Sequence, residues 1–416
     1  MTARRTLSLP GDTPGPPGSL DRLLATKSIA IFCGPGGVGK TSVAAASAAL
    51  AASRLGGKVL VVTVDPARRL ADALGLATLG NLERAVPADR LKAAGLEVRD
   101  PGSSGAQPRT PGLWAAMLDT KQSWDDLVLR HARDEETAYR ILENRLYHNL
   151  TARFVQSHDY IAMERLHEIH AEGGYDLIVV DTPPTRNALD FLEAPQRMAD
   201  FFGSRLLRWL TTPYRVGGKR GARMINLASR PFYQVADRIL GGKFLEDIAE
   251  FFLNFQTMYD GFVQRARSVE ALLHDRRTTF VVVSTLETAP LREAEFFISE
   301  LSARKLHLGA VVLNKTLPDY LQGGAGDSAA RALCADPGPA AQAAAEADAE
   351  LDQATAGRVL ATVGESFLNF EVAAKREAEL RGELGRLSAP VLRVPAFEED
   401  IHDLRGLVRL GECLFG

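Results

Sequence analysis

Residues 28–41 read Ser-Ile-Ala-Ile-Phe-Cys-Gly-Pro-Gly-Gly-Val-Gly-Lys-Thr. An apolar run ends at Gly34, and a run of small residues from Ser42 to Ser53 begins directly after this stretch. The pattern predicts a strand, a glycine-rich loop and the start of a helix, in that order. The loop fits the pattern G-x-x-x-x-G-K-[ST], which is typical of phosphate-binding loops.

Each residue type in this loop suits the binding of a phosphate chain. Glycines accept backbone angles that are closed to other residues, so successive N–H groups can point at one anion. The following helix adds its positive N-terminal end. Lys40 is placed to reach the outer phosphates, and the Thr41 hydroxyl is suited to ligate Mg²⁺. A glycine-rich turn without a ligand is the alternative interpretation. The residues predicted to bind a nucleotide are Gly36, Gly37, Val38, Gly39, Lys40, Thr41 and Ser42.

The composition bounds the class of protein. The 416 residues are 46% apolar and 24% charged, as in an ordinary soluble protein. The net charge of −3 gives no electrostatic reason to expect a nucleic acid partner. The 3 cysteines are far apart in the sequence, which fits a reducing compartment better than a disulfide framework. Because no apolar stretch reaches membrane-spanning length, we expect a cytoplasmic protein that is not integral to a membrane and at most peripheral to one.

Apolar, β-branched runs recur along the chain, and helical stretches separate most of them. This alternation predicts an α/β fold, namely a doubly wound, mostly parallel sheet with helices on both faces. The strands are expected at residues 28–33, 58–64, 113–118, 176–181, 279–285, 308–313 and 390–395.

Segments that break this rhythm predict the domain organisation. Residues 1–25 contain a Pro- and Gly-rich stretch and are expected to form a mobile tail. One nucleotide-binding domain is expected to comprise residues 26–186 and 276–416, with an all-helical subdomain inserted at residues 187–275. Residues 322–357 are rich in Ala, Gly and acidic residues and are expected to be flexible.

Two of the predicted strands end in aspartate. Asp65 follows the strand that starts at Lys58, and Asp181 follows the strand that starts at Tyr175. An aspartate that leaves a strand is commonly only a helix cap or a turn residue. Beside a phosphate loop, however, one carboxylate is suited to hold Mg²⁺ and another to orient the attacking water. Open parallel sheets bind ligands at this carboxyl edge, so we expect both aspartates near the loop.

These motifs together resemble those of the anion-transporting ATPases, the family of arsenite-transporting and tail-anchored-protein-targeting ATPases among the dimeric P-loop ATPases. The resemblance extends over most of residues 26–416. The motifs resemble, in the same order along the chain, the family's phosphate loop, two switches, adenine-reading strand end and late loop. The matching segments are Gly34–Thr41 and residues 65–67, 181–185, 312–315 and 394–400.

The resemblance implies ATP and Mg²⁺ as cofactors and assigns roles to residues. It implies that Asp65 positions the lytic water, that Asp181 serves Mg²⁺ and that Asn314 reads adenine. The late loop with Pro395 and Phe397 is implied to cover the base. The implied catalytic residues are Asp65 and Lys40, and the implied metal residues are Thr41, Asp181 and Asp65.

The implied function is a dimeric, Mg²⁺-dependent ATPase, but one position departs from the family pattern. A second lysine of the family's loop reaches the nucleotide of the partner protomer, and the chain has Pro35 at this position. Arg68 and Arg69, directly after the first switch, are candidates for a replacement charge. The chain is therefore expected to be either a slow ATPase, as a homodimer, or a weakly hydrolytic nucleotide-binding subunit that pairs with an active paralogue.

The helical region carries a broad apolar face between Phe244 and Phe262, with large side chains at three- and four-residue steps. One interpretation is that this face is the core of the helical layer. The other is a groove for a client helix or a lipid within residues 187–275. Because the second switch runs into this region near Asn187, nucleotide state is expected to open or close the face.

Overall fold

An eight-stranded sheet with the order β3-β4-β2-β5-β1-β6-β7-β8 forms the centre of the protein. The computed structural model describes residues 19–64, 69–98, 111–144, 146–148, 151, 155–182, 200, 251–252, 254–255, 258–347, 351–384 and 387–415. Neighbouring strands are parallel except for the short edge strand β3, which is antiparallel to β4. The strands are β1 Ile29–Cys33, β2 Lys58–Thr63, β3 Arg84–Ala85, β4 Gly112–Met117, β5 Leu177–Asp181, β6 Thr278–Ser284, β7 Leu308–Thr316 and β8 Val391–Pro395.

The predicted α/β fold and each of the predicted strands are therefore confirmed. Every residue of β1, β5 and β6 is buried, because helices cover both faces of the sheet there. Such strands consist of nearly continuous apolar, β-branched residues, which is why the sequence reveals them. The edge strand β3 has only two residues, both exposed, and its sequence carries no comparable pattern.

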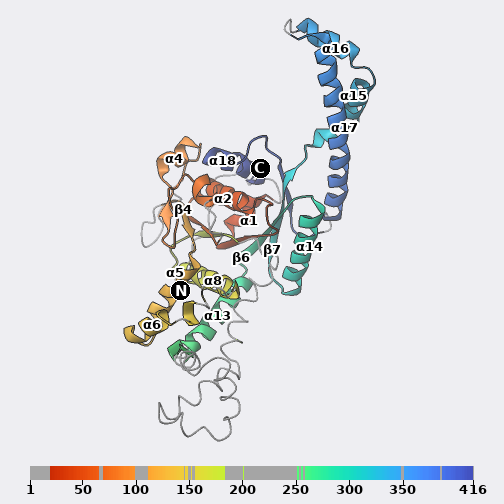
Figure 1. Cartoon of the computed structure of the whole chain (residues 1–416). Coiled ribbons are helices and arrows are strands. Elements are labelled where there is room, and N and C mark those ends of the chain that lie inside the picture. Colours follow the sequence, from red (N-terminus) through yellow and green to blue (C-terminus); the bar gives the residue numbers. More distant parts are fainter. Residues whose placement is uncertain are drawn as a thin grey trace, which may run out of the picture.

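Helices form a layer on each face of the sheet, and Figure 1 shows α1, α2 and α18 above it, α8 and α13 below it and α14 at its right; α14 packs into the same core as α8 and α13. Beneath the lower layer, α5 and α6 join α8 and α13 around a separate aromatic core. The helices are α1 Leu20–Ala25, α2 Lys40–Leu50, α3 Arg69–Ala73, α4 Ala88–Ala93, α5 Thr120–His131, α6 Glu135–Leu142, α8 Val155–Glu172, α13 Tyr259–His274, α14 Thr288–Ala303, α15 Gly324–Ala335, α16 Gly338–Ala347, α17 Gln353–Leu384 and α18 Leu404–Phe415, with a π-helical turn at Ala51–Leu55 and a 3-10 turn at Asp319–Gln322.

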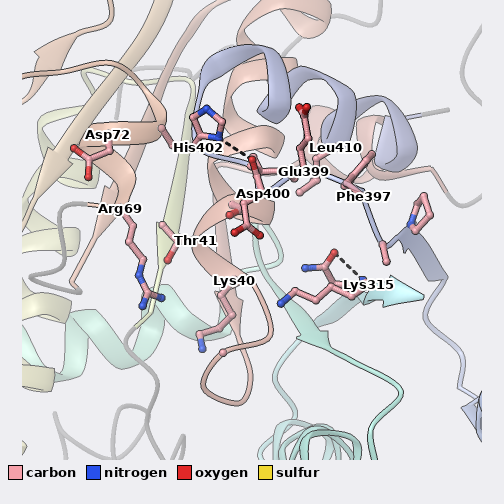
Figure 2. Close-up of a pocket in the computed structure, with 18 of the residues that line it drawn as sticks. Lys40, Thr41, Arg69, Asp72, Lys315, Phe397, Glu399, Asp400, His402 and Leu410 are labelled. Carbon is pink, nitrogen blue, oxygen red and sulfur yellow. Dashed lines mark hydrogen bonds between the residues drawn. The ribbon is translucent and has the colours of Figure 1, made fainter. Parts of the chain in front are cut away.

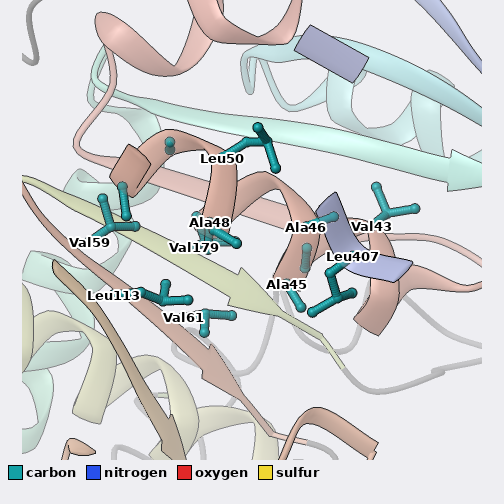
Figure 3. Close-up of a cluster of buried hydrophobic side chains, with 14 of the residues drawn as sticks. Val43, Ala45, Ala46, Ala48, Leu50, Val59, Val61, Leu113, Val179 and Leu407 are labelled. Carbon is teal, nitrogen blue, oxygen red and sulfur yellow. The ribbon is translucent and has the colours of Figure 1, made fainter. Parts of the chain in front are cut away.

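Small side chains let α2 approach the sheet closely, as Figure 3 shows. The alanines of α2 are buried between strand residues such as Val61 and Val179 on one side and Leu407 of α18 on the other. On the α18 side, a Cβ atom on Gly411 would lie 2.4 Å from the Leu50 side chain. This dense packing fixes α2, and therefore the loop that precedes it, against the sheet.

Two segments differ from the sequence-based expectation. Residues 20–25 of the predicted tail form α1, which buries Leu20 and Leu24 completely against the upper core. The segment 322–357, predicted to be flexible, is largely helical where it is described, comprising α15, α16 and the start of α17. Figure 1 shows that α15, α16 and α17 form an arm that stands away from the sheet.

Most of the predicted helical subdomain lies outside the described residues, including Phe244, Ile248 and Asn187. Its described end is α13, and Phe251, Phe255, Met258 and Phe262 are all buried in the aromatic core with Trp124 and Tyr160. In these positions the apolar face belongs to the protein's own core. Within the described ranges, no helix combines the length and apolar character needed to cross a membrane.

Candidate functional site

A cavity of about 620 Å³ opens at the carboxyl edge of the sheet (Figure 2). Its walls come from the loop after β1, from α3, from the end of β7, and from the chain that follows β5 and β8, so five segments far apart in the sequence meet there. Cavities of this size accommodate a nucleotide-sized ligand. The lining residues are Gly37, Gly39, Lys40, Thr41, Ser42, Arg69, Asp72, Ala73, Thr182, Asn314, Lys315, Pro395, Ala396, Phe397, Glu399, Asp400, Ile401, His402 and Leu410.

The glycine-rich loop has a backbone that side chains would not permit. Gly34, Gly37 and Gly39 have φ values of 139°, 79° and 89°, in the region that favours glycine. A Cβ atom on Gly34 would lie 2.1 Å from the Val283 carbonyl oxygen of β6, and one on Gly39 would lie 2.4 Å from Asn314 Nδ2. The glycines are therefore needed both for the turn and for its close fit against β6 and β7.

Helix α2 begins at Lys40, directly after Gly39, and its N-terminus lacks a side-chain cap. The first N–H groups of a helix have no partner inside the helix, and they carry a partial positive charge. The first turn of α2 also contains no acidic residue. These donors face the cavity through Lys40, Thr41 and Ser42, so this wall is suited to an anion.

The Lys40 side chain lies against its own loop. Its ammonium group donates a hydrogen bond of 2.6 Å to the carbonyl oxygen of Pro35. Lysine has three donors, so this bond orients the ammonium group without excluding a phosphate oxygen as a second partner. Pro35 itself is buried, so no charged side chain leaves the loop at this position.

Asp181, at the end of β5, is buried and joins two hydroxyl groups. Its Oδ2 accepts hydrogen bonds from Thr41 Oγ1 at 2.7 Å and from Thr63 Oγ1 at 2.9 Å. Thr182, the next residue, donates from its hydroxyl to the Phe32 carbonyl at 2.9 Å and lines the cavity. The carboxylate is thus fixed beside the start of α2 by contacts from β2 and α2.

A hydroxyl and a carboxylate at this distance are hard oxygen donors of the kind that Mg²⁺ prefers. In the described part of the chain, no group of three or more His, Cys, Asp and Glu side chains is placed to hold a metal ion. Mg²⁺ commonly binds with one or two protein ligands, several waters and substrate phosphates. The donors of Thr41 and Asp181 fit that mode of binding. They do not fit a metal cage made of protein ligands alone.

The opposite side of the cavity is built from the ends of β7 and β8. Asn314 is buried, donates from Nδ2 to the Val38 carbonyl at 2.8 Å and accepts from the Lys315 N–H at 3.0 Å. Lys315 has a φ of 58°, unusual for a lysine, and its exposed side chain lines the cavity. Phe397 presents its ring from the late loop, where the Arg409 guanidinium lies 5.9 Å from its centroid.

Most of the predicted site residues come together. Gly37, Gly39, Lys40, Thr41, Ser42, Asn314, Pro395 and Phe397 line one cavity, while Val38 and Asp181 contact its walls. Gly36 lies in the same loop but does not line the cavity. Asp65 and Arg68 lie outside the described residues.

Other lining residues were not predicted from the sequence. Lys315 and His402 line the cavity, and Thr63 holds Asp181. Lys315 is the last residue of the predicted motif 312–315, and Thr63 lies two residues before Asp65; these positions are the only signals that the sequence offers for them. Nothing in the sequence around His402 distinguishes it; its Nδ1 lies 2.8 Å from the Asp400 carbonyl oxygen.

Cys33 lies directly before the glycine-rich loop but does not take part in the site. Its thiol is buried, and burial raises the pKa of this thiol far above its ordinary value, although the nearby Lys40 charge acts in the opposite direction. A thiol with such a pKa carries almost no thiolate at neutral pH and is a poor nucleophile and metal ligand. Cys33 is therefore a core residue of β1.

Comparisons with known proteins place the chain in a family. A family model described as anion-transporting ATPase matches residues 27–331. The Aquifex aeolicus protein named "Putative arsenical pump-driving ATPase 1" is 25% identical over 302 residues, which cover 70% of this chain and 64% of that protein. A protein of Paramecium tetraurelia named ATPase ASNA1 homolog 2 is 25% identical over 296 residues, which cover 69% of this chain and 75% of that protein.

The match to the Aquifex protein therefore spans less than two thirds of its length. The family model, in contrast, covers well over half of this chain and includes the loop after β1, the Asp181 segment and Asn314. The same residues meet around one cavity in the structure. The sequence match, together with this arrangement, shows that the chain belongs to the anion-transporting ATPase family.

Proposed function

We propose that the chain binds ATP with Mg²⁺ in this cavity and hydrolyses it to ADP and inorganic phosphate. The observation that carries the proposal is the contact between Thr41 and Asp181, 2.7 Å long, at the end of a glycine loop that also presents Lys40. A nucleotide triphosphate requires a place for its phosphate oxygens, a metal site beside them and a cation. The glycine loop, Lys40 and the Thr41–Asp181 contact lie at one wall of the cavity, and this arrangement supports the proposal.

The phosphate chain lies, in this proposal, along the glycine loop and the first turn of α2. The N–H groups of Lys40, Thr41 and Ser42 stand at the N-terminus of α2, where no side chain caps them. The Lys40 ammonium group then adds a full charge to these partial ones. Its bond to the Pro35 carbonyl holds it over the loop before the ligand arrives, which reduces the cost of ordering it.

Mg²⁺ is held, in this proposal, by the Thr41 hydroxyl and, directly or through water, by Asp181. When bound, the ion neutralises charge on the phosphate oxygens during transfer. Asp181 is already oriented by Thr63 at 2.9 Å, so its carboxylate needs little rearrangement. We propose Asp65 as the residue that positions the attacking water, on the basis of the family resemblance alone.

The base lies, in this proposal, at the end of the cavity formed by Asn314, Pro395 and Phe397. The Phe397 ring provides an apolar face for stacking. Asn314 Nδ2 donates one hydrogen bond to the Val38 carbonyl, and its second hydrogen is then the donor proposed for the base. The same amide therefore braces the phosphate loop and contacts adenine.

At the level of assembly, we propose a cytoplasmic dimer whose nucleotide state controls a client or partner surface. Phe251, Phe255, Met258 and Phe262 of the helical region are buried, and Phe252 is partly buried against the same core. We propose a surface for a client helix or a lipid within residues 187–275, most of which lie outside the described residues. This part of the proposal rests on the family resemblance.

A weakly hydrolytic partner subunit of an active paralogue is the second candidate. Pro35 favours it, because a buried proline replaces the cation that relatives direct toward the partner's nucleotide. The two candidates share ATP binding and differ in turnover.

The test is steady-state ATP turnover of the purified chain, with Lys40→Ala as the blank and Lys121→Ala, an exposed lysine of α5, as the charge-matched control. The ATPase proposal predicts turnover in the unmodified chain and in Lys121→Ala, with loss in Lys40→Ala. Binding of Mg·ATP without turnover above the blank would contradict it in favour of the partner subunit.

A further inference from the structure

Arg69 is a basic residue of the cavity that the proposed function has not used. It is the first residue of α3, is exposed and lines the same cavity as Lys40 and Thr41. Figure 2 shows its guanidinium group pointing toward the end of the cavity where the glycine loop lies, whereas Asp72, one turn along α3, points another way. Among the described residues, Arg69 makes no ion pair and no side-chain hydrogen bond.

The order of the strands fixes which end of the cavity Arg69 faces. α3 follows β2, and β2 is the neighbour of β5, the strand that carries Asp181. Lys315 belongs to β7, on the other side of β1 and its loop. Arg69 therefore approaches from the side where Thr41 and Asp181 meet, and Lys315 from the side of Phe397.

That side is where the proposed metal and the outermost phosphate lie. A phosphoryl group in transfer carries charge on three equatorial oxygens, and a guanidinium group matches such oxygens with two parallel N–H donors. An arginine that has no partner among the described residues keeps these donors for a ligand. Of the other basic residues lining the cavity, Lys40 already serves the phosphate chain in the proposed function, and Lys315 stands at the opposite side.

We propose that Arg69 is the catalytic cation of this site and that it acts on the nucleotide bound by its own chain. Its guanidinium contacts the terminal phosphate and stabilises the charge that develops during transfer. This inference rests on the proposed ATP hydrolysis. It removes the need for a lysine at position 35 that reaches across a dimer, since the buried Pro35 cannot supply a charge.

The step that Arg69 assists is balanced without a further reactant. A water oxygen bonds to the terminal phosphorus, and the bond from that phosphorus to the bridging oxygen breaks. The electron pair of the broken bond leaves with ADP, and both protons of the water remain on the phosphate. ATP⁴⁻ and water thus give ADP³⁻ and H₂PO₄⁻, and Arg69 exchanges no proton in this step.

The first test compares turnover with binding in the full chain. Arg69→Ala is expected to lower kcat about a thousandfold, which is the lower end of the loss seen when such a cation is removed from phosphoryl-transfer enzymes. The dissociation constant of Mg·ATP is expected to change less than about fivefold, because Lys40, Thr41 and the loop remain. Arg69→Lys restores part of kcat. Arg292→Ala, which removes an exposed charge from α14, serves as the matched control and leaves kcat unchanged.

A transition-state analogue separates a catalytic role from a structural one. Binding of Mg·ADP with aluminium fluoride is expected to weaken in Arg69→Ala in parallel with kcat, while binding of Mg·ADP alone does not. A kcat of Arg69→Ala within twofold of the unmodified chain would overturn the inference. No measurable Mg·ATP binding by the unmodified chain would instead contradict the proposed function, so the two failures are distinguishable.

A mixing experiment tests the claim that Arg69 acts within its own chain. Arg69→Ala and Lys40→Ala are each inactive in this account, and a mixture of the two is expected to stay inactive. If Arg69 acted across a dimer, a mixed pair would contain one site with both Lys40 and Arg69, and activity would return. Recovery of more than about a tenth of the unmodified activity would therefore contradict the claim.

Discussion

Asp181 is the residue whose contacts carry the proposed Mg²⁺ site. Its Oδ2 accepts from Thr41 and Thr63, and an asparagine oxygen can accept the same two bonds. Asp181→Asn should therefore fold normally while losing the charge that a divalent cation needs. We expect Mg²⁺-dependent ATP turnover to fall about a hundredfold or more, since changes even one shell further from a metal cost about 10–100-fold.

Asp72→Asn is the matched control for this change, because Asp72 lines the same cavity from α3. We expect its turnover to stay within about threefold of the unmodified chain. Turnover measured against Mg²⁺ concentration checks both variants. Equal losses in the two would show that the overall charge of the cavity, and not the contact to Thr41, determines the effect.

Sequence patterns predicted the site residues that stand at defined positions in motifs. They did not predict the site residues whose position depends on the local backbone conformation. Lys40, Thr41 and Asp181 stand at fixed distances from a glycine loop or a strand end, so their meeting followed from the fold class. Lys315 enters the cavity only because the chain turns through a φ of 58° at a lysine, next to a register shift between β7 and β8. No local sequence pattern predicts a left-handed backbone conformation at a residue other than glycine or asparagine.

Between elements, the fit of the glycine loop against β6 predicts a contrast between two glycines. Gly34 and Gly37 both have positive φ, but only Gly34 would place a Cβ against backbone, 2.1 Å from the Val283 oxygen, whereas nothing lies within 4 Å of one on Gly37. Gly37→Ala should cost about 1 kcal/mol of unfolding free energy through its backbone angle alone. Gly34→Ala should cost at least about 2 kcal/mol, because β1 and β6 must also separate. Denaturant unfolding of the two variants measures the difference, and equal losses would contradict the observed packing.

The arm of α15, α16 and α17 makes a second contrast between glycines. A Cβ on Gly364 of α17 would lie 2.8 Å from the Ala330 carbonyl oxygen of α15, while one on Gly382 of the same helix meets nothing within 4 Å. Gly382→Ala should stabilise α17 by about 0.5–1 kcal/mol, the ordinary gain in a helix. Gly364→Ala should destabilise the arm by about 1–3 kcal/mol because the helices must move apart.

Hydrogen exchange of residues 324–384 measures both effects on the arm. We expect faster exchange in Gly364→Ala, slower exchange in Gly382→Ala, and no change of Mg·ATP affinity in either. Fast, unprotected exchange throughout this segment in the unmodified chain would restore the interpretation of a flexible linker.

The composition of the arm explains why it was predicted as flexible. Residues 322–357 consist mostly of Ala, Gly and acidic residues, which give no apolar stripe for a core. The structure stabilises the segment through close backbone approach at Gly364 and through its base, where Arg393 of β8 donates to Asp319 at 2.6 and 3.1 Å. Alanine and glycine allow such approach, but their sequence does not show what they approach.

Over the whole molecule, the sheet was predictable and the helical extensions were not. The strands are apolar because both faces of the sheet are covered, so the sequence reveals them, whereas their order comes from the structure. The aromatic residues Phe251, Phe255 and Phe262 were equally consistent with a core or with an exposed groove. These side chains are buried beside Trp124 and Tyr160, so they belong to the core. The spacing of apolar residues along a helix does not show what covers its apolar face.

The proposed function requires that a triphosphate binds at the place where Lys40, the glycine loop and the Thr41–Asp181 pair meet. Calorimetric titration of the full chain with Mg·ATP, beside Lys40→Ala and the Lys121→Ala control, tests this most directly. We predict a saturable heat of binding in the unmodified chain and in Lys121→Ala, and an affinity at least about a hundredfold weaker in Lys40→Ala, as expected for loss of a charged partner of phosphate. Absence of binding heat in the folded, unmodified chain, or equal affinity in Lys40→Ala, would contradict the account.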